Sequence, residues 1–102
     1  MKYVVIDSFK ADYKRLSRDE QARFKFALKD FTAACDQYAA DPSLVWPASL
    51  RVKDVESAPG ILEMTWSFSG PDGRATFEWV RIEGRLGLRW RRIGGHGIFK
   101  DP

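Results

Sequence analysis

A short stretch near the end of the chain, RWRRIGGHGIF, collects residue types that can handle a phosphate group. It runs from Arg89 to Phe99 and contains three arginines and His96, the only histidine in the sequence. Arginine offers several donors in one plane and can bind phosphate bidentately, and histidine, with a usual pKa near about 6.5, exchanges protons at neutral pH. An aromatic ring such as Phe99 can stack on an unpaired base. The stretch therefore indicates a site for a polyanion.

Cleavage of RNA without a metal ion needs these same groups. A base must deprotonate the 2′-hydroxyl, cations must stabilise the charge at phosphorus, and an acid must protonate the leaving 5′-oxygen. A metal-dependent nuclease would show clustered carboxylates, and the acids of this chain are scattered. We therefore expect neither a metal ion nor another cofactor.

The distribution of charge points to the same end of the chain. The formal net charge is +3 over 102 residues, but residues 81–100 hold six basic residues against one acid, whereas residues 1–50 hold eight basic and seven acidic ones. A local basic field of this kind suits nucleic acid or an acidic protein partner. A solvated arginine-rich strand with no binding role is the alternative.

Composition and length indicate one globular domain spanning residues 1–102. Hydrophobic residues make up 44% of the chain and charged residues 30%, and no apolar run approaches the roughly 18 residues of a membrane span. The start of the chain lacks the features of a signal peptide, so we expect a cytoplasmic protein. The single cysteine, Cys35, predicts neither an internal disulfide nor a zinc site.

The first half of the chain is predicted to hold a strand and a helical hairpin. Residues 2–6 (KYVVI) have the composition of a strand, and the apolar spacing that starts at Phe9 predicts a short helix. Ser17 and Glu20 match a capping box at the start of a second helix, which should end near Asp41-Pro42. Its apolar stripe consists of Phe24, Leu28, Phe31, Cys35 and Tyr38.

The second half alternates between apolar and polar residues, which predicts strands. Expected strands are LRVKDV at 50–55, ILEMTWSF at 61–68, RATFEWV at 74–80 and LGLRWRRI at 86–93. The inward residues of the last three are Leu62, Met64, Trp66, Phe68, Ala75, Phe77, Trp79, Leu86, Leu88 and Trp90. The predicted fold class is α+β in the order β-α-α-β-β-β-β, an antiparallel meander of three or four strands with the helices packed on one face.

The opposite face of that sheet should be polar and open. Alternation places seven side chains on it: Glu63, Thr65, Arg74, Thr76, Glu78, Arg89 and Arg91. The last strand would deliver His96 and Phe99 to its edge. Two plainer interpretations stay open, namely that Glu63 forms a cross-strand ion pair with Arg74 or Arg91 and that His96 is an exposed turn residue.

The order of elements and several short motifs resemble the RelE/ParE superfamily of bacterial toxins from type II toxin–antitoxin pairs. The resemblance rests on LRVKDV, a break, GILEMTW, then DGRATF and a basic final strand. The string GGHGIF also resembles, locally, the Gly-Ser-His-x-x-Phe string of HicA-type toxins. One departure is Thr65, which stands where the superfamily has an arginine on the third strand.

The resemblance implies a ribosome-dependent mRNA endonuclease (an mRNA interferase, a hydrolase that binds RNA) that an antitoxin protein neutralises in a hetero-oligomer. It implies that Arg74 and Arg91 stabilise phosphate, that His96 acts as general acid or base, and that Phe99 stacks on a base. Substrate-binding roles would also fall on Lys53, Arg89 and Arg92. The sister branch inhibits DNA gyrase without cleaving anything, and a phage or mobile-element domain that only binds is a third possibility that Thr65 keeps open.

Overall fold

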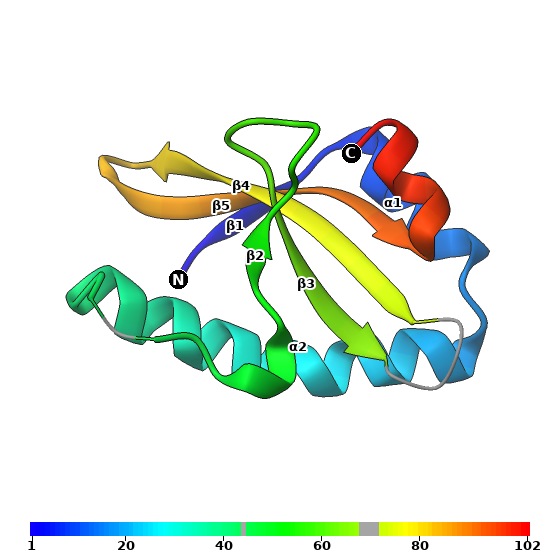
Figure 1. Ribbon diagram of the computed structural model, residues 1–102, viewed down its shortest axis with the longest axis horizontal. Helices are drawn as coiled ribbons and strands as arrows, with labels where there is room; N and C mark the ends of the chain where they lie inside the picture. The colour runs from blue at the N-terminus through cyan, green and yellow to red at the C-terminus, as the bar shows by residue number, and fades with distance from the viewer. Residues whose placement is uncertain (44, 68–71) are drawn as a thin grey trace.

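Figure 1 shows the protein as a computed structural model that describes residues 1–43, 45–67 and 72–102, with the backbone alone at His96. Along the chain the elements are β1 (Tyr3–Val5), α1 (Asp7–Arg15), α2 (Arg18–Ala40), the 3₁₀ turn η1 (Ala48–Leu50), β2 (Lys53–Asp54), β3 (Leu62–Ser67), β4 (Gly73–Ile82), β5 (Arg85–Gly94) and the 3₁₀ turn η2 (His96–Lys100). The predicted α+β class is confirmed. Neither helix in these ranges is both long and apolar enough to cross a bilayer.

The strands form one five-stranded mixed sheet in the order β1-β5-β4-β3-β2. The strands β2 to β5 pair antiparallel in sequence, as predicted, but β1 lies parallel to β5 at the edge. The sheet is therefore mixed, and its order differs from the predicted meander of three or four strands because β1 is added at its edge. Alternation within a segment reports which side chains share a face, and it contains no information on a neighbour more than 80 residues away, such as Leu88 beside Tyr3.

The two helices begin and end where capping chemistry requires. The Ser17 Oγ accepts from the backbone N–H of Glu20 at 3.1 Å, and the Glu20 carboxylate accepts from the backbone N–H of Ser17 at 2.9 Å. This is the predicted capping box, and it separates α1 from α2. Helix α2 ends at Ala40, directly before Asp41-Pro42.

Aromatic side chains between α2 and the sheet form the core. Trp90 of β5 is 1% exposed and lies at the centre, with its ring centroid 5.2 Å from Phe31 and 5.6 Å from Phe77. Phe9 of α1 and Phe24 of α2 complete the ring of contacts at 5.6 and 5.5 Å. This confirms the predicted apolar stripe of α2 and the inward face of β4 and β5.

Two local predictions about the strands were wrong. The strand expected at 50–55 is reduced to Lys53–Asp54, because η1 and the left-handed backbone of Arg51 (φ 46°) precede it. Leu86, expected to point into the core, is 39% exposed, since it lies near the tip of the β4–β5 hairpin, which projects beyond the other strands (Figure 1). The predicted inward residue Phe68 lies outside the described residues.

A β-bulge in β5 resets the alternation of the last strand. Thr76 pairs with Arg92 while Phe77 pairs with Trp90, so Arg91 is an extra residue opposite β4. As a result Trp90 and Ile93, three positions apart, both enter the core. The chain then continues into η2, which packs beside the polar face of the sheet through Ile98 and Phe99.

The polar face is thus only partly open, contrary to the prediction. Four side chains of β3 and β4 on this face are buried, namely those of Glu63, Thr65, Arg74 and Thr76. The segment after β2 and the C-terminal η2 lie over them (Figure 1), with Val55 and Ile98 buried beneath at 5% and 4% exposure. The part carrying Arg89 and Arg91 stays half-exposed.

Candidate functional site

The polar face contains a pocket of about 440 Å³ to which four separate elements contribute. Strand pairing assembles it: Lys53 of β2 is opposite Glu63 of β3, Thr65 of β3 is opposite Arg74 of β4, and Arg74 is opposite Gly94, which leads into η2. Phe99 of η2 lines the same pocket. Three residues predicted from sequence, Lys53, Arg74 and Phe99, are therefore brought together.

The guanidinium of Arg74 has unused hydrogen-bonding capacity. The residue is 7% exposed, its Nε lies 3.7 Å from Glu63 Oε1, and its Nη2 donates to Asp72 Oδ2 at 3.3 Å. The remaining nitrogen, Nη1, is buried and has no hydrogen-bond partner among the described residues. Buried donors are normally satisfied, so this nitrogen is available to donate to a group that enters the pocket. Glu63 is also 3.7 Å from the Lys53 Nζ, so one carboxylate faces two cations.

Arg89 and Arg91 share a different carboxylate further along the same face. The Nε of Arg89 donates to Glu78 Oε1 at 2.8 Å, and the Nη1 of Arg91 donates to Glu78 Oε2 at 3.0 Å. Arg91 also donates from Nε to the carbonyl oxygen of Pro102 at 3.0 Å. Neither arginine lines the pocket of Arg74. Glu78 compensates one of their two charges, and the pair keeps a net positive charge of about one.

Arg92 is bound to helix α1 instead. Its Nε and Nη2 donate to the two carboxylate oxygens of Asp12 at 2.6 and 3.2 Å, and this hydrogen-bonded pairing raises the pKa of Arg92. Asp12, 6% exposed, also accepts from the backbone N–H of Ile93 at 3.2 Å. Helix α1 thereby covers the edge of β5 beyond the end of β1. The structure places Arg92 in this joint and not in the pocket.

His96 begins η2, two residues after Gly94, and Gly94 is paired with Arg74. Two residues span at most about 7 Å, so the backbone of His96 starts close to the pocket. The side chain of His96 lies outside the described residues, and so does the predicted convergence of its imidazole with Arg74.

The carboxylates that pair with the arginines were largely missed from sequence. The Glu63–Arg74 ion pair was foreseen as an alternative and is confirmed. Glu78 was placed on the right face, and its position directly opposite Arg89 could have indicated the pairing. Asp12 gave no local signal, because it is 80 residues from Arg92. Among the described residues, no group of three or more His, Cys, Asp or Glu could hold a metal ion.

Comparison with protein-family profiles, curated proteins and solved structures finds no significant match to this chain.

Proposed function

We propose that this chain is the toxin of a type II toxin–antitoxin pair and cleaves mRNA on the ribosome without a metal ion. The observation that carries the proposal is the buried guanidinium of Arg74, whose Nη1 has no hydrogen-bond partner among the described residues, in a pocket that Lys53 and Phe99 also line. A guanidinium, an ammonium and an aromatic ring suit a phosphate and an adjacent base. The resemblance of the motifs to RelE/ParE toxins supports the same reading.

In this proposal the charge that develops at phosphorus is stabilised by Arg74, with Lys53 in support. The carboxylate of Glu63 lies between these two cations, so a phosphate entering the pocket would compete with it for both. His96, at the start of η2, acts as general acid or base, and Phe99 stacks on a base. Arg91 and Arg89 extend the cationic surface next to the pocket. Partners would be the ribosome with its mRNA and a cognate antitoxin, in the cytoplasm.

The ion pairs between the arginines and nearby carboxylates favour a second candidate function. In it, a domain of similar layout binds its target without cleaving it. Arg74, Arg89, Arg91 and Arg92 all have a carboxylate within ion-pair distance. A face whose cations are already paired attracts a polyanion less strongly than free arginines would. The gyrase-inhibiting branch belongs to this second candidate.

Induction of the wild type and of two variants in a bacterial host tests the proposal. We expect wild type to arrest growth and to produce cut mRNA, mapped by primer extension, whereas Arg74→Met and His96→Ala should allow growth. Arg85→Met, at the exposed hairpin tip, is the matched control and should remain toxic. Circular dichroism of each purified variant shows whether it is folded.

The other outcomes decide either against the nuclease or against the residues assigned to its site. Growth arrest with intact mRNA and filamentous cells would favour a gyrase inhibitor. Toxicity of folded Arg74→Met equal to that of wild type would remove Arg74 from the site. Normal growth on induction of wild type would favour a binding domain without toxicity.

A further inference from the structure

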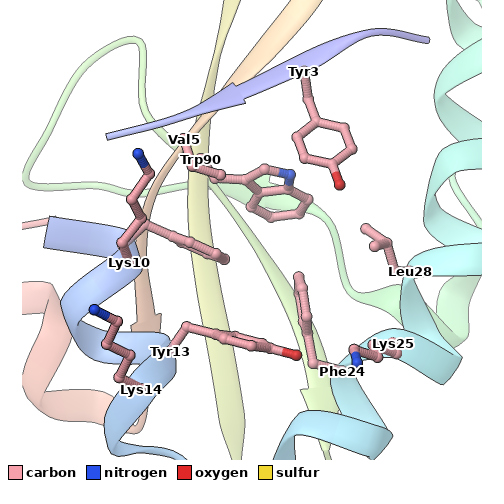
Figure 2. Close-up of a pocket in the computed structure, with 10 residues that line it drawn as sticks. Tyr3, Val5, Lys10, Tyr13, Lys14, Phe24, Lys25, Leu28 and Trp90 are labelled. Carbon is pink, nitrogen blue, oxygen red and sulfur yellow. The ribbon is translucent and has the colours of Figure 1, made fainter. Parts of the chain in front are cut away.

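A second concave surface lies on the opposite, helix-covered side of the sheet. It is a groove of about 380 Å³ between β1 and the two helices (Figure 2). Its apolar lining comes from four elements, with Trp90 of β5 at the floor and three pairs around it: Tyr3 and Val5, Phe9 and Tyr13, Phe24 and Leu28. None of these residues lines the pocket of Arg74, so the groove is independent of the proposed nuclease site.

Three lysines surround this apolar groove. Lys10 and Lys14 lie one helical turn apart on α1, and Lys25 lies on α2. All three are exposed, and none forms an ion pair with any residue in the described part of the chain. This contrasts with Arg74, Arg89 and Arg91 of the polar face, each of which has a carboxylate within ion-pair distance. The groove therefore combines an apolar floor with uncompensated positive charge at its rim.

The edge of β1 beside the groove has free backbone groups. The carbonyl of Lys2 accepts from Leu88 at 3.3 Å and the N–H of Ile6 donates to Trp90 at 3.2 Å, so the even-numbered residues face β5. In a parallel pair, alternate residues direct their backbone groups to the neighbour, so those of Tyr3 and Val5 point away from the sheet. Within the described residues no strand lies beyond β1. The side chains of Tyr3 and Val5 line the groove below that edge.

We propose that β1 and this groove bind a short extended segment of a partner protein with two apolar residues flanked by acids. The segment adds to the edge of β1 through the backbone groups of Tyr3 and Val5. Its alternate side chains then project to one face, as strand geometry requires, and two apolar ones enter the groove. Acidic side chains before and after them on the same face reach the lysines of α1 and α2.

The positive charge at the rim favours an acidic segment as the occupant of the groove over a second copy of the chain. Two copies pairing through β1 would bring Lys10, Lys14 and Lys25 of one groove close to those of the other, and like charges there are unfavourable. A groove rimmed by free cations complements an acidic segment instead. An extended segment, unlike a helix, also satisfies the outward backbone groups of β1.

A pair of seven-residue peptides provides the test. The acidic probe, acetyl-Asp-Thr-Leu-Thr-Leu-Thr-Asp-amide, places both leucines and both acids on one face when extended, and the basic control replaces each Asp by Lys. Binding to the full chain is measured by NMR titration at low salt, together with hydrogen exchange of the backbone amides. We expect the acidic peptide alone to bind and to slow exchange at Tyr3 and Val5.

Charge reversal provides the matched variants. Lys10→Glu combined with Lys14→Glu should weaken binding of the acidic probe about tenfold, since each exposed pair contributes up to about 1 kcal/mol. Lys29→Glu combined with Lys100→Glu makes the same change in net charge at exposed positions outside the groove and should leave binding unchanged.

Four results would overturn the proposal. The first two are that the acidic peptide does not bind at millimolar concentration and that both peptides bind equally well. The third is that binding shifts the NMR signals of Trp90 and Leu28 without slowing amide exchange at Tyr3 and Val5. The fourth is that both double variants weaken binding of the acidic peptide to the same extent. Protection of Tyr3 and Val5 that rises with protein concentration in the absence of peptide would assign the edge to a second copy instead.

Discussion

The two faces of the sheet are built on different principles. Against α2 the sheet presents aromatic and aliphatic side chains around Trp90, and the core residues of that face carry no charge. On the other face nearly every side chain is polar, and buried residues such as Glu63 and Arg74 depend on one another for compensation. Burial of apolar area stabilises without regard to direction, whereas a buried charge is tolerated only with a partner in the right place.

The two faces therefore have different roles: one stabilises the fold, and the other carries the groups that can bind. The apolar face supplies most of the area removed from water. The polar face contributes little net stability, because the cost of desolvating its charges offsets their attraction. Changes on the first face should therefore unfold the protein, and paired changes on the second should leave it folded while altering what it binds.

The largest effect is expected for Trp90→Ala. Trp90 is 1% exposed and touches four aromatic rings, so its truncation should lower the free energy of unfolding by about 3–5 kcal/mol, measured by urea denaturation. Phe26→Ala on α2, where the ring is 75% exposed, is the control and should change stability by less than about 0.5 kcal/mol. Similar losses for both would contradict the assignment of the core.

On the polar face, Glu63→Leu should cost about 1–3 kcal/mol, because among the described residues it leaves the buried Arg74 with Asp72 as its only carboxylate within ion-pair distance. Adding Arg74→Met should recover most of that loss, since replacing both charges of a buried pair by apolar groups is often neutral. Urea denaturation of the two single variants and the double variant gives the unfolding free energies that complete this double-mutant cycle. A double variant less stable than either single one would mean that this face stabilises the fold in its own right.

Cys35 makes the apolar face sensitive to alkaline pH. Burial raises the pKa of its thiol from 9.0 to about 12, so above pH 9 the unfolded chain loses this proton while the folded chain keeps it. The contribution of Cys35 is complete below pH 9 and is lost as pH rises toward 12, by about 1.4 kcal/mol at pH 10. Denaturation of wild type and Cys35→Ala at pH 8 and pH 10 measures the difference, and parallel losses in both proteins would refute it.

The smallest effect is expected for Lys2→Ala. Lys2 and Glu83 form an ion pair at 2.6 Å, but their side chains are 67% and 73% exposed. Solvent screens such a pair, so the change in unfolding free energy should be less than about 0.5 kcal/mol and should vanish in high salt. A decrease in unfolding free energy of more than about 1 kcal/mol, in thermal or urea denaturation, would show that this exposed ion pair stabilises the fold despite screening by solvent.

Sequence reasoning succeeded where the information was local. The capping box at Ser17 located the boundary between the helices, and the alternation around Phe77 and Trp90 identified the inward face of the sheet. Both signals depend on residues a few positions apart. The Asp12–Arg92 joint and the parallel pairing of β1 depend on segments separated by most of the chain, and no local pattern encodes them.

The candidate site could be predicted in part for the same reason. Lys53, Arg74 and Phe99 were named from sequence and line one pocket, because strand register and the turn into η2 bring them together. Arg92 was expected to bind substrate, but the bulge at Arg91 sets it opposite Thr76, and its guanidinium pairs with Asp12 of α1. A bulge adds a residue without an obvious change in composition, so alternation alone misassigns the positions that follow it.

The bulge in β5 accommodates two successive arginines, Arg91 and Arg92, between two core residues. Trp90 and Ile93 are three positions apart, so regular alternation would place only one of them in the core. With Arg91 unpaired, Arg92 lies opposite Thr76 and Ile93 lies opposite Ala75. A chain without Arg91 would pair regularly and keep Ile93 in the core, but it would lose the contact between Arg91 and Glu78 on the polar face.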